Sequence, residues 1–183
     1  MVAVGVGGLE IAAGMASGRC FLTYPKVVRV NLEGRLQPWV SAKDIALELM
    51  RIFTTKGNVG IAVEYGGSGI ASLSVPERAT ITNLGAEMGV TTSIFPSDEV
   101  TKAFLAAQGR AAEWSPIQPD DDASYEKVIT LDVGGIVPNI ACPHSPDNVV
   151  TVKEIEGLEV NQIIVGSCTN SSYRDLMIVA EML

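Results

Sequence analysis

A cysteine flanked by small polar residues stands near the end of the chain, in the stretch VGSCTNSSYRD at 165–175. The apolar run 162–165 predicts a strand, and the residues from Tyr173 to Leu183 predict a helix. Cys168 would then lie where a strand becomes a helix, where free backbone N–H groups and the helix dipole stabilise a thiolate and lower its pKa. Such a thiolate suits a bound metal or an iron–sulfur cluster. The alternative is a buried, unreactive cysteine in a tight turn.

Asn83 and Glu87 occur four residues apart in the stretch TNLGAEMG at 82–89. The surrounding pattern predicts a helix over 76–88, so both side chains are expected on one helix face. On spacing alone, an exposed polar face without a ligand is the preferred interpretation.

Other metal ligands are few. The remaining cysteines, Cys20 and Cys142, lie far from Cys168 in the sequence, and His144 is the one histidine. Three widely spaced cysteines do not predict a disulfide framework, and they favour a reducing, intracellular compartment. One histidine excludes a multi-histidine zinc site built from this chain alone.

The composition is that of a packed globular protein, with 47% apolar and 19% charged residues among 183. The net charge is −8, and Lys and Arg are scattered singly, so a nucleic-acid partner is not expected. No apolar run approaches the roughly 20 residues that span a bilayer, so no membrane partner is expected either.

Strand patterns alternate with helix patterns, which predicts an α/β architecture. Ser41 with Asp44 three residues later predicts the start of a helix over 41–56, and Ser97 is expected to cap another that ends at Gly109. Residues 111–125 are expected to form a loop, and 134–148 an extended connection. The predicted strands lie at 26–32, 59–65, 92–95, 128–133, 149–152 and 162–165.

Several stretches, taken together, resemble the aconitase family. GSCTNSSYRDL at 166–176 is similar to the family's signature around the first of its three cluster-ligand cysteines. The other blocks resemble consecutive family blocks in the same order: VGVGGLEIAAGMA (4–16), PKVVRVNLEGRLQPWVSAKD (25–44), VEYGGSGIASLSVPERATITNLGAEMG (63–89) and TTSIFPSDE (91–99). The resemblance covers the whole chain apart from the loop at 111–125.

The resemblance implies layered α/β/α domains, each with a mixed sheet flanked by helices. It assigns residues 1–25 to the end of one domain, 26–148 to a complete second domain, and 149–183 to the start of the next. The chain is therefore expected to be an internal segment of a larger enzyme.

The family is known for a hydro-lyase that converts citrate into isocitrate through cis-aconitate. Hydroxide is a poor leaving group, so this chemistry requires a Lewis acid, which the family supplies with a [4Fe–4S] cluster. By resemblance, Cys168 is a cluster ligand, Asn83 lies near the cluster, and Glu87 lies near the substrate or the metal-bound water. Three polar residues are expected to form a supporting shell: Ser167, Thr169 and Asn170.

Three thiolates hold such a cluster, and the family takes the other two from a downstream Cys-x-x-Cys that this chain lacks. Cys20 and Cys142 do not match ligand positions. The chain alone is therefore expected to hold no intact cluster and to be inactive. The full-length enzyme would carry the cluster and act on a tricarboxylate or related hydroxy acid. It is expected in the cytoplasm, or in the mitochondrial matrix of a eukaryote.

The stretch at 91–99 favours aconitate hydratase over two near relatives, the large subunit of 3-isopropylmalate dehydratase and homoaconitase. Two alternatives come from other classes. A non-catalytic module could bind RNA, but a net charge of −8 argues against phosphate contacts. A redox-sensing protein centred on Cys168 would have a thiol pKa well below the ordinary value of about 8.5.

Overall fold

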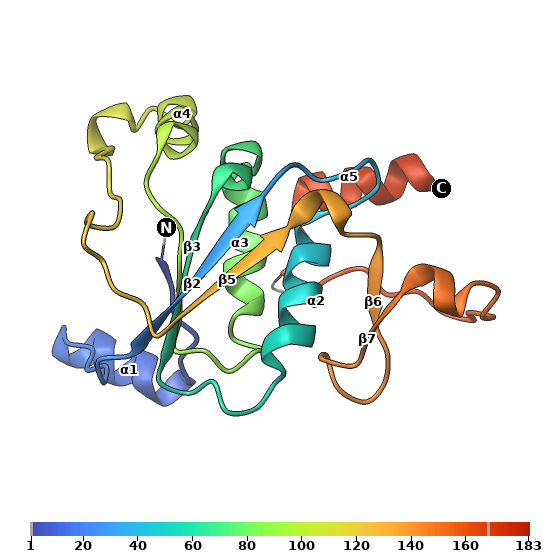
Figure 1. The fold of residues 1–183 in the computed structure, drawn as a ribbon, viewed down its shortest axis with the longest axis horizontal. Helices are drawn as coiled ribbons and strands as arrows, with labels where there is room; N and C mark the ends of the chain where they lie inside the picture. Colours follow the sequence, from blue (N-terminus) through green and yellow to red (C-terminus); the bar gives the residue numbers. More distant parts are fainter. Residues whose placement is uncertain (1, 168) are drawn as a thin grey trace.

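The structure is a computed structural model that describes residues 2–167 and 169–183. Strands and helices alternate along most of the chain (Figure 1). The strands are β1 (Val2–Ala3), β2 (Lys26–Glu33), β3 (Ile61–Gly66), β4 (Thr92–Ile94), β5 (Lys127–Asp132), β6 (Asn139–Ala141) and β7 (Val149–Thr151). The α-helices are α1 (Gly8–Ser17), α2 (Ala42–Phe53), α3 (Val75–Leu84), α4 (Glu99–Ala107) and α5 (Tyr173–Met182).

Five strands form one mixed sheet in the order β1-β4-β3-β2-β5. β2 is parallel to both β3 and β5, and β3 is parallel to β4, whereas the short β1 is antiparallel to β4. Parallel neighbours need crossover connections, which α2 and α3 supply between β2, β3 and β4. The α/β class with a mixed sheet flanked by helices is therefore confirmed.

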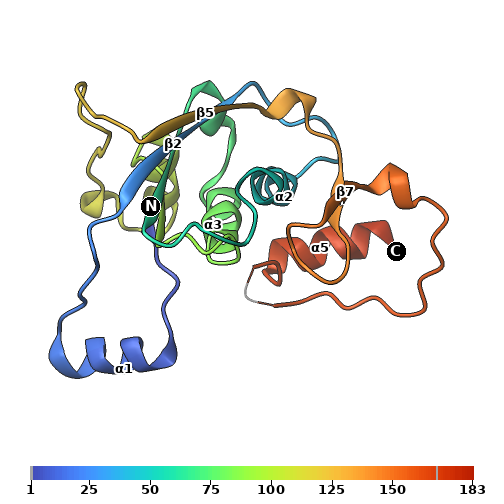
Figure 2. The same ribbon diagram turned by 60° about the horizontal axis from the view of Figure 1, so that its bottom comes forward.

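The core lies between the sheet and the helices α2 and α3, which Figure 2 shows on the same side of the sheet. Alternate residues of β2 face this core: Val28, Val30 and Leu32 are buried, because successive side chains of a strand point to opposite faces. On α2, Ile45 and Leu49 lie one turn apart and are completely buried against them. The sequence pattern of strand 26–32 and helix 41–56 thus predicts this packing.

The other face of the sheet carries polar side chains. Arg29 of β2 forms an ion pair with Glu64 of β3, and the Tyr125 hydroxyl donates a hydrogen bond of 2.8 Å to the same carboxylate. Gly66 packs against Arg29 so closely that a Cβ there would lie 1.7 Å from a guanidinium nitrogen. Any side chain at Gly66 would therefore displace the Arg29 guanidinium from its present position beside Glu64.

Two expectations about where helices begin and end were wrong. The helix predicted over 76–88 ends at Leu84, because residues 85–89 form tight turns with i to i+3 hydrogen bonds such as Glu87 N–H to Leu84 O, 3.1 Å. The cap of α4 is Asp98, whose carboxylate accepts from the backbone N–H of Thr101. Ser97, the predicted cap, instead exchanges backbone hydrogen bonds with Ile117.

The predicted strand at 162–165 does not form. These four residues are exposed, and no strand among the described residues lies beside them to accept backbone hydrogen bonds. The expected extended connection at 134–148 contains β6, which pairs antiparallel with β7.

The β6–β7 hairpin is tied to both ends of α2 by aspartates. At the start of α2, Asp44 Oδ1 accepts a hydrogen bond of 2.7 Å from the backbone N–H of Asn139. At its end, Asp147 Oδ2 accepts one of 3.0 Å from the backbone N–H of Thr55. The predicted domain boundary after residue 148 falls between the two strands of this hairpin. This boundary stays a prediction. Within the described residues, every helix is too short or too polar to cross a membrane.

Candidate functional site

A pocket of about 250 Å³ lies beside the first turns of α2 and α5 and along one side of α3. We call it the three-helix pocket. Its lining residues are Ser41, Ala42, Lys43, Pro76, Glu77, Ala79, Thr80, Asn83, Thr169, Asn170, Ser172, Arg174, Asp175 and Ile178.

The topology explains where this pocket lies. α2 follows the carboxyl end of β2, and α3 follows that of β3, so both helices start at the carboxyl edge of the parallel strands. Open α/β sheets bind ligands at this edge. Helix α5 reaches the same edge, since Arg174 Nη2 lies 3.2 Å from Glu77 Oε1 in the first turn of α3, and the loop before α5 contacts the last turn of α3, where Thr169 Oγ1 donates a hydrogen bond of 2.9 Å to Asn83 Oδ1.

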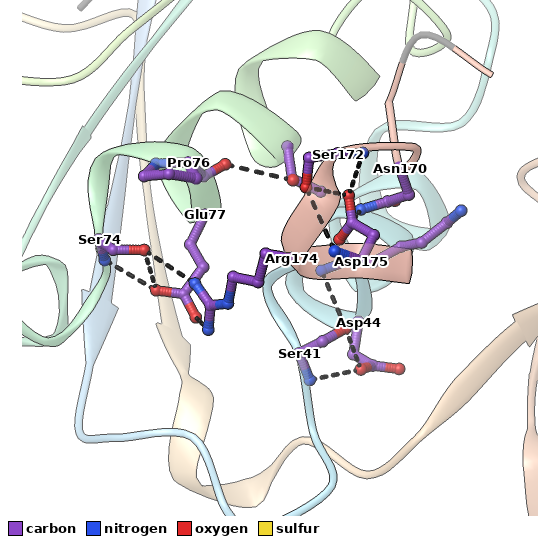
Figure 3. A network of polar contacts seen from close by, with 11 residues as sticks. Ser41, Asp44, Ser74, Pro76, Glu77, Asn170, Ser172, Arg174 and Asp175 are labelled. Atoms are coloured by element: carbon purple, nitrogen blue, oxygen red, sulfur yellow. Dashed lines mark hydrogen bonds and ion pairs between the residues drawn. The ribbon is translucent and has the colours of Figure 1, made fainter. Parts of the chain in front are cut away.

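Each of the three helices begins with a capping box built in the same way (Figure 3). In each, one carboxylate oxygen accepts from both the backbone N–H and the hydroxyl of the capping serine. The distances are 2.7 and 2.9 Å for Asp44 with Ser41, 2.8 and 2.6 Å for Glu77 with Ser74, and 3.0 and 2.7 Å for Asp175 with Ser172.

The second oxygen of each capping carboxylate holds a residue from the last third of the chain. Asp44 Oδ1 accepts from the backbone N–H of Asn139, Glu77 Oε1 from the guanidinium of Arg174, and Asp175 Oδ1 from the amide of Asn170. The three boxes therefore do more than begin helices. They also fix the segments that surround the pocket.

Asp175 is ionised at neutral pH. Burial alone would raise the pKa of its carboxyl group, but the hydroxyl and backbone N–H of Ser172 and the amide of Asn170 donate to the charged form. Together these hydrogen bonds hold the pKa below its ordinary value of 3.8. Asp175 is thus a structural acceptor and no proton donor near neutral pH.

The charges that line the pocket balance. Lys43 and Arg174 are positive, Glu77 and Asp175 are negative, and the other lining residues are neutral. The carboxylates also occupy the helix N-termini, whose N–H groups would otherwise attract an anion. The described residues therefore supply polar contacts and an apolar wall of Ala42, Ala79 and Ile178, but no excess positive charge.

The structure brings together three of the residues predicted from the sequence. Asn83, Thr169 and Asn170 all line the pocket, and the first two are in direct contact. Ser167 does not line it, although its carbonyl accepts a hydrogen bond of 2.7 Å from the Ser171 hydroxyl. Cys168 lies outside the described residues, so its role as a cluster ligand stays a prediction.

Glu87 does not join this group. Because α3 ends at Leu84, Glu87 lies in the turn beyond the helix, where it is exposed and lines no part of the pocket. The expectation of one shared helix face with Asn83 depended on the longer helix. A role for Glu87 near the substrate stays a prediction.

Arg174 and Glu77 were not identified from the sequence as residues of the pocket. The pattern Ser-x-x-Asp/Glu at 74–77 and 172–175 is a visible sequence signal for a capping box. That Arg174 reaches across to the box of α3 depends on tertiary structure, and no local pattern contains it.

The described residues do not fit a complete iron–sulfur site. A [4Fe–4S] cluster is held by cysteine thiolates, and the described cysteines, Cys20 and Cys142, do not line the pocket. Within residues 2–167 and 169–183, no three His, Cys, Asp or Glu side chains lie close enough to hold a metal.

Replacing Thr169 by valine tests the contact that brings the loop to α3. Valine has nearly the same shape but no hydroxyl, so the hydrogen bond to Asn83 is lost at a cost of about 1 kcal/mol. Amide hydrogen exchange of residues 169–175 is expected to become faster. Thr80→Val is the matched control, because the Thr80 hydroxyl bonds within its own helix, to Pro76 O. Equal exchange in both variants would show that the contact does not hold the loop.

The fold and the pocket together define an α/β unit that presents polar side chains at the carboxyl edge of its parallel strands. The sequence pattern of the Aconitase family (aconitate hydratase) matches residues 1–183, and the chain belongs to this family. The resemblance found in the sequence is thereby confirmed.

The curated relatives carry a more specific name. The chain is 38% identical to the 3-isopropylmalate dehydratase large subunit of Elusimicrobium minutum over 99% of its length, and 40% identical to large subunit 2 of Archaeoglobus fulgidus over 98%. It is 39% identical to large subunit 1 of Methanopyrus kandleri. In each case it spans 43% of the relative. The preference for aconitate hydratase, with its place in the tricarboxylic acid cycle, is not confirmed, and the near relative fits these matches better.

Proposed function

We propose that the full-length protein is a hydro-lyase of the 3-isopropylmalate dehydratase type. The observation that carries this proposal is a sequence identity of 38–40%, over nearly the whole chain, to large subunits of that enzyme from three different organisms. The reaction would remove water from a hydroxy acid and add it back at the neighbouring carbon.

The three-helix pocket supports this proposal in its size and lining. About 250 Å³ is enough to admit a small hydroxy acid. The amide of Asn83 and the hydroxyl of Thr169 would orient the polar end of such a molecule, while Ala79 and Ile178 would face an aliphatic part. Glu87 is kept in this proposal as a site residue, to be tested by substitution.

The balanced charge of the pocket has a consequence for the proposal. A dicarboxylate substrate carries two negative charges, whereas only one of the two lining cations, Lys43, forms no ion pair among the described residues, because Arg174 is paired with Glu77. We therefore infer that residues beyond this chain neutralise the substrate. The relatives are named large subunits, so we further propose that the full-length protein works together with a smaller subunit.

A [4Fe–4S] cluster is proposed as the cofactor of the full-length protein, where it would supply a Lewis acid for the departing hydroxyl group. Cys168 would provide one ligand, and the other ligands would come from residues outside this chain. The cytoplasm is the proposed compartment.

Comparing substrates tests the proposed function. The full-length protein, prepared without oxygen and with iron and sulfide, would be mixed with its small subunit and given 3-isopropylmalate, citrate or homocitrate. We expect kcat/KM for 3-isopropylmalate to exceed that for the other two by more than about 100-fold, because a pocket built for one substituent leaves polar groups unpaired with another. Higher kcat/KM for citrate would restore aconitate hydratase, and no turnover of any of the three would refute the proposal.

A further inference from the structure

The segment 169–175, which we call the α5 lead, is held on α3 at two separate points. At one end, Thr169 Oγ1 donates to Asn83 Oδ1 at 2.9 Å. At the other, Arg174 Nη2 lies 3.2 Å from Glu77 Oε1 and Nη1 lies 3.3 Å from Ser74 Oγ. Figure 3 shows the arginine extending from α5 to the first turn of α3.

The two points are well separated along α3. Glu77 and Asn83 are six positions apart, which corresponds to about 9 Å at a rise of 1.5 Å per residue. A segment held at one point can pivot about it in any direction, whereas a segment held at two such points can rotate only about the line that joins them. The arginine contact therefore decides the angle at which the α5 lead crosses α3.

Glu77 is a rigid partner for the arginine. Its Oε2 is occupied by the backbone N–H and hydroxyl of Ser74, at 2.8 and 2.6 Å, so its rotamer is fixed by the capping box. Oε1 then points to a defined place. The planar guanidinium meets both Oε1 and the Ser74 hydroxyl with two different nitrogens, an arrangement that a lysine ammonium cannot copy.

The chain before the α5 lead gives it little support. Residues 156–165 are exposed along their whole length and contain neither helix nor strand. Within the lead itself, Asn170 and Ser172 bond to Asp175, so the lead is internally braced and can move as a unit. Its placement thus depends on its contacts with α3.

We propose that Arg174 is a positioning residue that fixes the orientation of the α5 lead on α3 and so presents Thr169 correctly beside Asn83 in the three-helix pocket. The positioning role does not depend on the proposed function, and only its expected effect on kcat rests on that function. The side-chain pair is partly exposed, with 57% of Arg174 and 26% of Glu77 accessible, so its loss should leave global stability almost unchanged.

Hydrogen exchange tests the positioning directly, without reference to activity. In the full-length protein, Arg174→Gln and Glu77→Gln are each expected to speed the exchange of amides 169–175 by about two- to fivefold, the range that an exposed pair supports. Glu77→Gln keeps the capping box, because glutamine also serves at that position. Arg110→Gln is the matched control, since Arg110 is about as exposed as Arg174 and pairs with Glu113 away from the pocket. Unchanged exchange in Arg174→Gln would overturn the proposal.

Kinetics test the consequence. Arg174→Gln is expected to lower kcat by roughly tenfold with little change in KM, because a small misplacement of reacting groups slows the chemical step more than binding. Arg174→Lys should recover part of the loss. The double variant with Glu77→Gln should be no worse than either single variant, because both remove the same contact. If the double variant lost kcat by the product of the two single losses, the two residues would not act through their shared contact.

The two proposals can fail separately. If the wild-type protein turns over no hydroxy acid, the proposed function fails, while the exchange experiment still decides the role of Arg174. If turnover is found but Arg174→Gln matches the wild type in both exchange and kcat, the positioning proposal alone fails.

Discussion

Replacing Arg78 by methionine is expected to lower the free energy of unfolding by about 3–5 kcal/mol, the cost of breaking a buried ion pair from one side. The side chain of Arg78 is 1% exposed, and its guanidinium bonds to both carboxylate oxygens of Asp98 at 2.8 and 2.6 Å. It also donates to the carbonyl oxygens of Leu73 and Ile70. Methionine fills the space but removes all of these donors, so that Asp98 keeps only its hydrogen bonds from Thr101 and Ile70 O keeps only that from Leu73 N–H. Denaturant unfolding of both proteins measures the difference.

The pH dependence identifies the ion pair as the cause. Burial alone would raise the pKa of Asp98, but the hydrogen bonds from Arg78 and from the backbone N–H of Thr101 lower it below its ordinary value of 3.8. A lowered carboxyl pKa contributes stability that is present above the ordinary value and is lost as the pH falls through the folded value. The difference in the free energy of unfolding between wild type and variant should therefore become smaller below about pH 4. If this difference in the free energy of unfolding did not depend on pH, packing alone would cause the loss of stability. Arg110→Met, at an exposed pair, should not change unfolding.

Replacing Cys168, the proposed cluster ligand, by serine in the full-length protein is expected to reduce the proposed hydro-lyase activity by more than about 100-fold. Loss of a residue that only supports a metal ligand already costs 10–100-fold, so loss of a ligand should cost more. Iron and sulfide content and the visible absorption of the purified protein are the direct measurements. Both should fall together with activity.

The chain provides its own controls for this experiment. Cys20 is exposed and Cys142 is partly exposed, and neither lines the three-helix pocket. Cys20→Ser and Cys142→Ser should retain iron, sulfide and activity. A Cys168→Ser protein that keeps its full cluster would remove this cysteine from the ligand set, whatever the family resemblance implies.

The elements predicted well from sequence carry their signals locally. β2 alternates apolar and polar residues, and α2 begins with Ser41 and Asp44 and carries an apolar stripe, so both appear within one or a few residues of their predicted bounds. The strand predicted at 162–165 has the right residue types but no partner among the described residues. Strand formation depends on a neighbour, and a short apolar run contains no information about one.

The same distinction applies to the site. Asn83 and Thr169 were both proposed as site residues through the family resemblance, and the structure adds that they touch. The end of α3 separated Glu87 from them, because turns at 85–89 replace the regular helix. The contact of Arg174 with α3 joins residues 97 positions apart, which spacing rules for a single helix cannot anticipate.

The use of both oxygens of Asp44 limits how this position can vary during evolution. One oxygen receives two donors from Ser41, and the other receives the backbone N–H of Asn139. Asparagine would place an NH₂ group against one of these donors, and glutamate would displace both contacts by a methylene length. We infer that Asp44 cannot be replaced without the loss of a hydrogen bond. In an ordinary capping box, by contrast, glutamine can take the place of the carboxylate.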